Sequence, residues 1–287
     1  MKPMVKYRGG KSKEIELLTP YFPKKYKTYF EPFLGGGAVF FHLNPQKAVI
    51  NDINEKLMAF YGNVKNDYPR LRSELDSLEN EYSQNQKAYK ALKAKHPNDR
   101  VPNKNEDLYY SIRKEYNYPS GKYLPGTLYY FINKTAYSGM IRFNSDGEYN
   151  VPFGRYINFN THLITEEHHK LLKRTTVLNE DYETVFKMAS KDDFMFLDPP
   201  YDCVFNDYGN IDHAGGFSDD DQIRLATAFK KLKCKALMVV AKTPIIEKLY
   251  GSMIVGHYNK VYAVNIRNRF KNGAEHVIIV NYSEDKK

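Results

Sequence analysis

The segment Asp198-Pro199-Pro200-Tyr201 places a carboxylate, two prolines and an aromatic ring directly after the apolar run "FMFL". Proline fixes φ and has no N–H group, so the Asp198 carboxylate and the Pro199 carbonyl remain as two hydrogen-bond acceptors in a stiff segment. Two acceptors suit an amino group with two hydrogens to donate, and the ring of Tyr201 offers a stacking face for a planar base. The alternative is a proline-terminated strand without chemistry, but the flanking acid and aromatic ring favour an amino-group site.

Two segments nearer the N-terminus together favour a nucleoside ligand. "FEPFLGGGAVFF" (30–41) carries a glycine turn, and glycines let the backbone approach a ligand closely. The turn lacks the GxGxxG pattern, which argues against NAD. "INDIN" (50–54) puts Asp52 where its carboxylate can accept hydrogen bonds from both ribose hydroxyls. Taken singly, the turn is equally compatible with a structural role, and a helix cap is the better interpretation of Asp52.

A third segment, "KYRGGK" (6–11), surrounds two glycines with Tyr7, Lys11 and further cations. It is compatible with a chain end that lacks a role, or with a clamp on a carboxylate or phosphate. The segment alone does not separate these readings.

Short apolar runs alternate with helical patterns at both ends of the chain, which predicts an α/β sheet. The expected parallel strands are 27–33, 47–52, 175–181, 194–198 and 236–241, and the last three are expected to be buried. A closing strand pair is expected at 260–265 and 275–282, around a basic loop at 265–274. Helices are expected at 54–66 and 218–233, the second capped by Ser218.

The middle of the chain has a different character. Residues 68–95 are highly charged with sparse apolar positions, which predicts a solvated helix or helix pair. Strand-like residues flank Ser145-Asp146-Gly147, which predicts a hairpin. We therefore expect one α/β domain, residues 1–62 and 166–287, interrupted by a helical and hairpin insertion at 63–165.

The composition limits the class of protein. Lys and Arg number 43 against 34 Asp and Glu, a net charge of +9 that modestly favours a polyanionic partner. The two cysteines have no metal-ligand spacing, so a zinc site is not indicated. No segment has the pattern of a signal peptide or a membrane span, so we expect a cytoplasmic protein without membrane contact.

The ordered motifs resemble those of the Dam-like (D12 class, alpha group) adenine-N6-specific DNA methyltransferases. "KYRGGK", "FEPFLGGGAVFF", "INDIN", "FLDPPY" and "FSDDDQIRL" match in order, and "SGMIRFNSDGEYNVPFGRY" matches the DNA-contacting hairpin. The resemblance covers nearly the whole chain and is weakest at about 67–125. It implies a Rossmann-like S-adenosylmethionine-dependent sheet, with the insertion as target-recognition domain.

The resemblance also implies roles for individual residues. The positions matching cofactor contacts are Tyr7, Lys11, Glu31, Phe33, Gly35, Gly37, Asp52, Asp181 and Asp198. The catalytic segment is Asp198, Pro199, Pro200 and Tyr201, and the matching DNA-contacting positions are Met140, Arg142, Asn144, Arg155 and Tyr156. The implied reaction transfers a methyl group from S-adenosyl-L-methionine to N6 of a flipped-out adenine in duplex DNA, leaves S-adenosyl-L-homocysteine and requires no metal. Residues 202–216 are compatible with a lid over the site or with a passive loop.

The resemblance further implies a restriction-modification or solitary methylase, with a cognate endonuclease acting separately if one accompanies it, and we expect a monomer. Two alternatives remain open from the sequence. An RNA adenine-N6 methyltransferase would use the same tetrapeptide, and a DNA-binding protein with a degenerate cofactor site would keep the insertion without the chemistry. Intact Asp198 and Asp52 argue against the second alternative.

Overall fold

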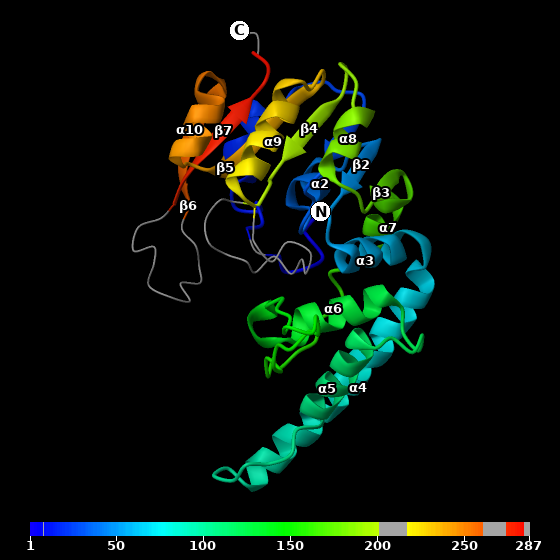
Figure 1. Ribbon diagram of the computed structural model, residues 1–287. Helices are drawn as coiled ribbons and strands as arrows, with labels where there is room; N and C mark the ends of the chain where they lie inside the picture. The colour runs from blue at the N-terminus through cyan, green and yellow to red at the C-terminus, as the bar shows by residue number, and fades with distance from the viewer. Residues whose placement is uncertain (8, 201–216, 261–273, 284–287) are drawn as a thin grey trace.

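The computed structural model describes residues 1–7, 9–200, 217–260 and 274–283. In these residues seven strands form one sheet in the order β3-β2-β1-β4-β5-β7-β6 (Figure 1). The strands are β1 (Tyr29–Glu31), β2 (Ala48–Asn51), β3 (Thr175–Leu178), β4 (Phe194–Leu197), β5 (Lys235–Ala241), β6 (Ile254–Lys260) and β7 (Ala274–Val280). The first five are parallel, whereas β7 runs antiparallel to both β5 and β6. This order confirms the expected Rossmann-like methyltransferase sheet.

The strand order reverses direction next to β1, and the space outside the strand ends at this point is called the crevice below. The chain goes from β1 to β2 on one side and returns from β3 to β4 on the other side. Ligands of open α/β sheets bind outside the carboxyl ends of the strands at such a point. Glu31 ends β1 and Asp198 follows β4, so the fold brings these two acids to the crevice.

Helices cover both faces of the sheet and form two apolar cores. The first core packs one face against α1 (Ile15–Leu18), α2 (Ala38–Leu43), α3 (Glu55–Asn66) and α7 (Glu166–Lys173). The second core packs the other face against α8 (Tyr182–Met188), α9 (Asp219–Lys230) and α10 (Pro244–Tyr250). The short 3-10 helix η1 (Thr19–Tyr21) lies between α1 and β1, and η4 (Gly251–Met253) lies between α10 and β6. Ser218 caps α9 and accepts from Asp221 N, as its sequence predicts.

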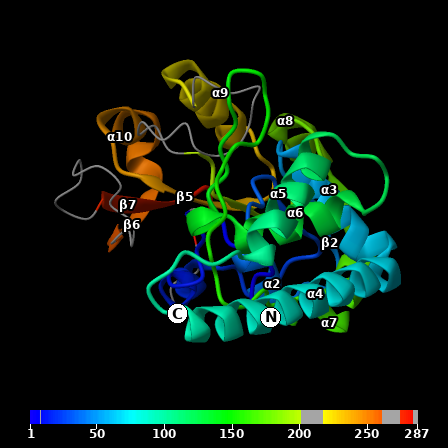
Figure 2. The same cartoon turned by 90° about the horizontal axis from the view of Figure 1, so that it is seen from below.

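Three helices and a hairpin lie between α3 and α7 in sequence. They are α4 (Tyr68–Lys95), α5 (Lys104–Asn117) and α6 (Pro125–Thr135), followed by the turn η2 (Tyr137–Gly139). Residues 68–95 form one helix rather than a pair. Helix α6 lies between the sheet and the arm built from α4 and α5 (Figure 1). From below, α3, α5 and α6 lie over the β2 half of the sheet, and β5, β7 and β6 lie beside them (Figure 2).

The structure differs from two expectations about strands. Strand β3 is parallel but only partly buried, because it is the edge strand. The closing strand was expected at 260–265, yet β6 spans Ile254–Lys260, and residues 261–265 lie outside the described part. Strand β6 lies at the edge of the sheet, where apolar residues are needed on one face only, and a bulge at Gly256 interrupts the alternation of apolar and polar residues. The sequence pattern that would predict a strand at 254–260 is therefore weak.

The hairpin at 140–159 is present in a looser form than expected. Its arms meet at the single bridge Phe143–Tyr149, with a second bridge joining Ala136 to Phe153. Side chains of α5 replace the missing ladder: Asn117 accepts from Tyr149 N at 2.9 Å, and the Tyr109 hydroxyl donates to Val151 O at 2.7 Å. The hairpin is therefore held by α5 rather than by a sheet.

No helix in the described residues combines the length and the apolar character needed to cross a membrane.

Candidate active site

The glycine turn after β1 is packed tightly against Tyr7. Gly35 has φ +50°, a conformation that side chains other than glycine rarely adopt. A Cβ at Gly35 would lie 2.8 Å from Cδ1 of the Tyr7 ring, so no larger residue fits without movement. Gly37, with φ +67°, is filled in the same way by the Phe41 ring. The hydroxyl of Tyr61, on α3, donates to the Gly35 carbonyl at 3.0 Å and fixes the turn.

Asp52 follows β2 and shares this turn. Its Oδ2 accepts from Gly35 N at 2.8 Å and its Oδ1 from Asn54 N at 3.0 Å. Asn54, not Asp52, caps α3 by accepting from Leu57 N, so the cap interpretation of Asp52 is wrong. Burial raises the pKa of the Asp52 carboxyl, and the two backbone donors oppose that shift. A carboxylate has four lone-pair positions, so Asp52 retains acceptor capacity for two hydroxyls.

Glu31 is a buried acid at the crevice. It is 2 % exposed and accepts from the Tyr29 hydroxyl at 2.6 Å. Burial raises its pKa to about 8, and the negative charge of Asp198 adds to the effect. The site thus holds an acid that a cationic ligand would ionise.

Asp198 lies next to a buried cation. Lys11 Nζ donates to Asp198 Oδ2 at 2.5 Å and to the Gly9 carbonyl at 2.9 Å. The Lys11 side chain is 2 % exposed and that of Asp198 is 21 % exposed, so a substrate can reach the acid but not the lysine from solvent. Burial lowers the pKa of Lys11, and the attraction of Asp198 opposes that change. Pro199 is buried and Pro200 is half-buried beside it.

Asn51 was not singled out from the sequence, yet it braces three strand ends. Its Nδ2 donates to Pro32 O at 3.0 Å and to Glu180 O at 2.9 Å, and its Oδ1 accepts from Glu180 N at 2.8 Å. Asn179 adds a bond from Nδ2 to the Asp52 carbonyl at 2.8 Å. A buried asparagine at the end of an apolar strand was the available signal, because such a side chain must find partners.

Phe33 and Asp181 lie on the side of α8. The Phe33 ring packs on Tyr182 at 5.3 Å between centroids. Asp181 caps α8 by accepting from Glu183 N at 2.9 Å, and Arg224 Nη2 donates to the same oxygen at 2.7 Å. Asp181 is half-exposed and already has structural partners, so the structure assigns it a cap and leaves a cofactor contact as a prediction.

Residues 6–11 run between the insertion and the sheet. Asn133 of α6 accepts from Lys6 N at 2.9 Å and donates to Lys6 O at 2.8 Å, as a strand partner would. Tyr7 then packs on the glycine turn and Lys11 reaches Asp198. Lys6, Tyr7 and Lys11 are therefore parts of the site, and the interpretation as a chain end without a role is wrong for them.

The hairpin residues differ in what they contact. Arg142 and Arg155 are exposed; Arg142 Nε donates to Asn150 at 2.8 Å, and Arg155 lies 3.9 Å from Glu106. Asn144 Oδ1 accepts from the backbone of Asp146 and Glu148, so it organises the turn. The remaining two also have contacts: Met140 O accepts from the Tyr149 hydroxyl, and the Tyr156 ring lies 4.3 Å from Lys6 Nζ.

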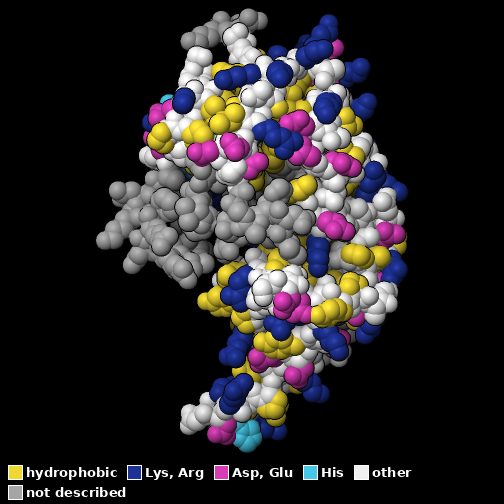
Figure 3. All heavy atoms as spheres, viewed as in Figure 1, with side chains coloured by type: hydrophobic (Ala, Val, Ile, Leu, Met, Phe, Trp, Pro, Cys, Tyr) yellow, Lys and Arg dark blue, Asp and Glu magenta, His cyan; other side chains and the backbone are white. Residues whose placement is uncertain are grey.

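Three expectations fall outside the described residues: the stacking role of Tyr201, the lid at 202–216 and the basic loop at 265–274, of which only Ala274 is described, as the first residue of β7. On the face seen in Figure 3, Lys and Arg side chains are interspersed with Asp and Glu over both the sheet part and the arm. The net charge alone does not locate a DNA surface on that face.

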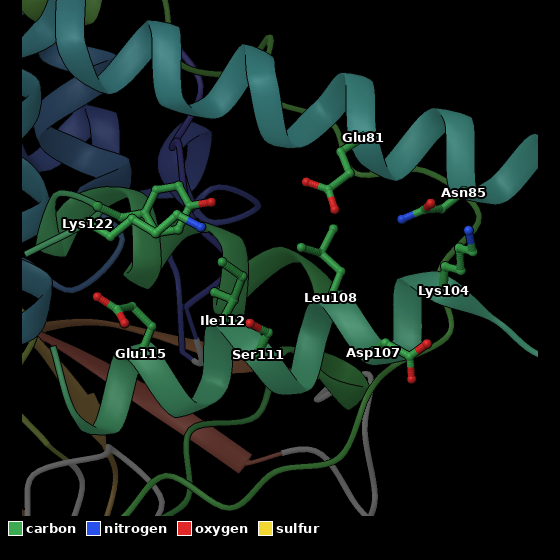
Figure 4. Close-up of a pocket in the computed structure, with 10 residues that line it drawn as sticks. Glu81, Asn85, Lys104, Asp107, Leu108, Ser111, Ile112, Glu115 and Lys122 are labelled. Atoms are coloured by element: carbon green, nitrogen blue, oxygen red, sulfur yellow. The ribbon is translucent and has the colours of Figure 1, made fainter. Parts of the chain in front are cut away.

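A hollow of about 550 Å³ lies elsewhere, between α4 and α5 (Figure 4). Acidic and basic side chains alternate around it, including Glu81, Lys104, Asp107, Glu115 and Lys122. It contains none of the predicted site residues, so it does not compete with the crevice as the candidate active site.

The fold and the crevice define a class of protein. A parallel sheet with a reversed seventh strand, a glycine turn, an acid after β2 and the acid–proline–proline segment after β4 indicate a nucleoside-cofactor methyltransferase. A model of the D12 class N6 adenine-specific DNA methyltransferases matches residues 7–266. The chain belongs to this family and is an adenine-specific DNA methyltransferase.

Named proteins are similar over nearly the whole chain. Type II methyltransferase M.CviBI of Paramecium bursaria Chlorella virus NC1A is 34 % identical over 291 residues, which cover 98 % of this chain and 100 % of that protein. Type II methyltransferase M.MjaIII of Methanocaldococcus jannaschii is 33 % identical over 308 residues, 98 % and 99 % of the two chains. The DNA adenine methylase of Haemophilus influenzae is 26 % identical over 264 residues, 90 % and 80 % of the two chains.

Proposed function

We propose that this chain transfers the methyl group of S-adenosyl-L-methionine to N6 of an adenine flipped out of duplex DNA, within a specific sequence. The observation that carries the proposal is the position of Asp198. It follows β4 at the point where the strand order reverses, beside Lys11. Glu31 and Asp52 lie at the carboxyl ends of the neighbouring strands β1 and β2. An acid there can accept from an amino group while the cofactor lies over the glycine turn.

The side chains of the crevice fit this cofactor. Glu31 suits its α-ammonium, Asp52 suits its ribose hydroxyls, and the Phe33 ring offers an apolar face to its methionine side. When bound, the cofactor supplies an electrophilic methyl group on a positively charged sulfonium.

Asp198 and the Pro199 carbonyl have the chemistry to activate the target nitrogen. The N6 lone pair of adenine is delocalised into the ring, and hydrogen bonds from its two protons to these acceptors localise it. As N6 bonds to the methyl carbon, the carbon–sulfur bond breaks with its electron pair remaining on sulfur, and N6 loses one proton through Asp198. Positioning and electrostatics supply the rate, without a covalent enzyme intermediate.

We assign DNA contact to the insertion, residues 63–165. The exposed Arg142 and Arg155 are proposed to contact guanine or phosphate, with Met140 and Tyr156 nearby and Asn144 shaping the turn. Two relatives named Type II methyltransferases and one named DNA adenine methylase support a restriction-modification or a solitary role. A monomer in the cytoplasm, with any cognate endonuclease as a separate protein, stays our prediction.

Tritiated methyl transfer tests the proposal. Wild-type protein is expected to label unmethylated duplex DNA with N6-methyladenine, and Asp198→Ala is expected to remove the label. Structured RNA should compete poorly with DNA. Labelled RNA in preference to DNA, or undiminished product from Asp198→Ala, would overturn the proposal. Calorimetric binding of the cofactor separates an enzyme from a protein that only binds DNA.

A further inference from the structure

The Gly9 carbonyl joins two buried ammonium groups. It accepts from Lys11 Nζ at 2.9 Å and from Lys260 Nζ at 3.0 Å. Lys260 ends β6 and pairs with Glu14 Oε1 at 3.0 Å, with 9 % and 11 % of the two side chains exposed. A contiguous chain of contacts therefore runs from Glu14 through Lys260, Gly9 and Lys11 to Asp198.

The formal charges of the four ionisable side chains in this series of contacts balance. Two ammoniums, Lys11 and Lys260, face two carboxylates, Asp198 and Glu14. His276 is buried against both lysines; burial and the two cations lower its pKa to about 3, so it adds no charge at neutral pH. Neutralising one member leaves an uncompensated buried charge next to the others.

The two lysines hold the backbone at the Gly9 carbonyl, between Tyr7, which packs on the glycine turn, and Lys11, whose carbonyl accepts from Glu14 N at 2.9 Å. Residues 6, 7 and 9–11, the described part of this segment, contain no helix or strand, and Gly9 has φ +78°. Asn133 binds the segment at Lys6, and Lys11 and Lys260 bind it at the Gly9 carbonyl. Buried ion pairs contribute little net stability, so a role in geometry explains the Glu14–Lys260 pair better than a role in stability.

We propose that Lys260 and Glu14 are positioning residues for methyl transfer: their ion pair holds the Gly9 carbonyl, and thereby Lys11, in the place that orients the Asp198 carboxylate. The inference rests on the proposed function, because it assigns the effect to the same acid. Neither residue touches the substrate, and both act through residues 9–11.

Steady-state kinetics of three variants and a matched control test the proposal. Lys260→Met and the isosteric Glu14→Gln should each lower kcat by about 10- to 100-fold, the scale expected for a displaced catalytic group, with KM for DNA unchanged. Lys260→Arg retains a cation that reaches both acceptors and should restore most of kcat. Lys65→Met is the control, because Lys65 Nζ also donates to a backbone carbonyl, that of Thr175 at 2.8 Å. Thr175 lies on the edge strand β3, on the opposite side of the sheet from β6, so this variant should leave kcat unchanged.

The outcomes separate the possibilities. The alternative role for Lys260 is contact with a DNA phosphate, and the carboxylate of Glu14 cannot make such a contact. Equal losses of kcat in Glu14→Gln and Lys260→Met therefore support positioning. A wild-type kcat in folded Glu14→Gln, or a change confined to KM for DNA in Lys260→Met, overturns the inference. If wild-type protein transfers no methyl group, the proposed function fails first, and the two failures are thereby distinguished.

Discussion

Glu31 shows how a single side chain can report cofactor binding. Burial raises the pKa of its carboxyl to about 8, so at pH 7 the acid is mainly protonated in the free protein. The α-ammonium of the cofactor favours the ionised form, so binding must release a proton. We predict release of up to about one proton per cofactor at pH 7, and affinity that increases as the pH rises from 6 to 7.5, below the titration of the α-amino group.

Calorimetry in two buffers of different ionisation enthalpy measures this release. Glu31→Gln is the control and should release no proton while binding the cofactor more weakly. Wild-type binding without proton release at pH 7 would show that the ammonium does not pair with Glu31.

At the scale of elements, the strand ends are predicted to depend on Asn51. Asn51→Ala removes three hydrogen bonds at the ends of β1, β2 and β3, one buried and two partly buried, so it should lower the free energy of unfolding by about 3 kcal/mol. It should also weaken cofactor binding at least tenfold (about 1.4 kcal/mol), because the glycine turn begins at Pro32. Urea denaturation and calorimetry measure the two effects.

Asn281 offers a matched control at the other end of the sheet. Its amide donates to Cys234 O at 2.9 Å and accepts from Ala236 N at 2.8 Å, where β5 begins. Asn281→Ala should lower stability but leave cofactor affinity within about twofold (about 0.4 kcal/mol) of wild type. Equal losses of affinity in both variants would argue against a local brace.

The sequence predicts elements better than it predicts contacts between them. Apolar runs bounded by polar residues were sufficient to place the parallel strands, and Ser218 was sufficient to place the start of α9. The contact of Lys11 with Asp198 joins residues 187 positions apart, and that of Lys6 with Asn133 joins residues 127 apart. No local pattern encodes such pairs. The cap at Asn54 rather than Asp52 was likewise ambiguous, because both residue types cap helices.

At the scale of the whole molecule, the first core continues from the sheet into the insertion. Phe60 of α3 is fully buried and stacks on Tyr129 and Tyr130 of α6 at 5.8 Å. We therefore predict a single unfolding transition, and Phe60→Ala should destabilise it by about 3–5 kcal/mol. The division at 62 and 63 stays a prediction about function, since α3 runs through it.

Differential scanning calorimetry tests this, with Phe229→Ala in the second core as the control. Both variants should shift the same transition to lower temperature. Two transitions, of which Phe60→Ala and Phe229→Ala each move only one, would show that the insertion unfolds independently.

Methylation-sensitive long-read sequencing of DNA from a host that expresses the protein tests the central claim most directly, because it reads the modified base and its sequence context together. Wild-type protein is predicted to produce N6-methyladenine at one recurring motif, and Asp198→Ala is predicted to produce none. Modified cytosine, adenines modified without a motif, or the same pattern from Asp198→Ala would contradict the account.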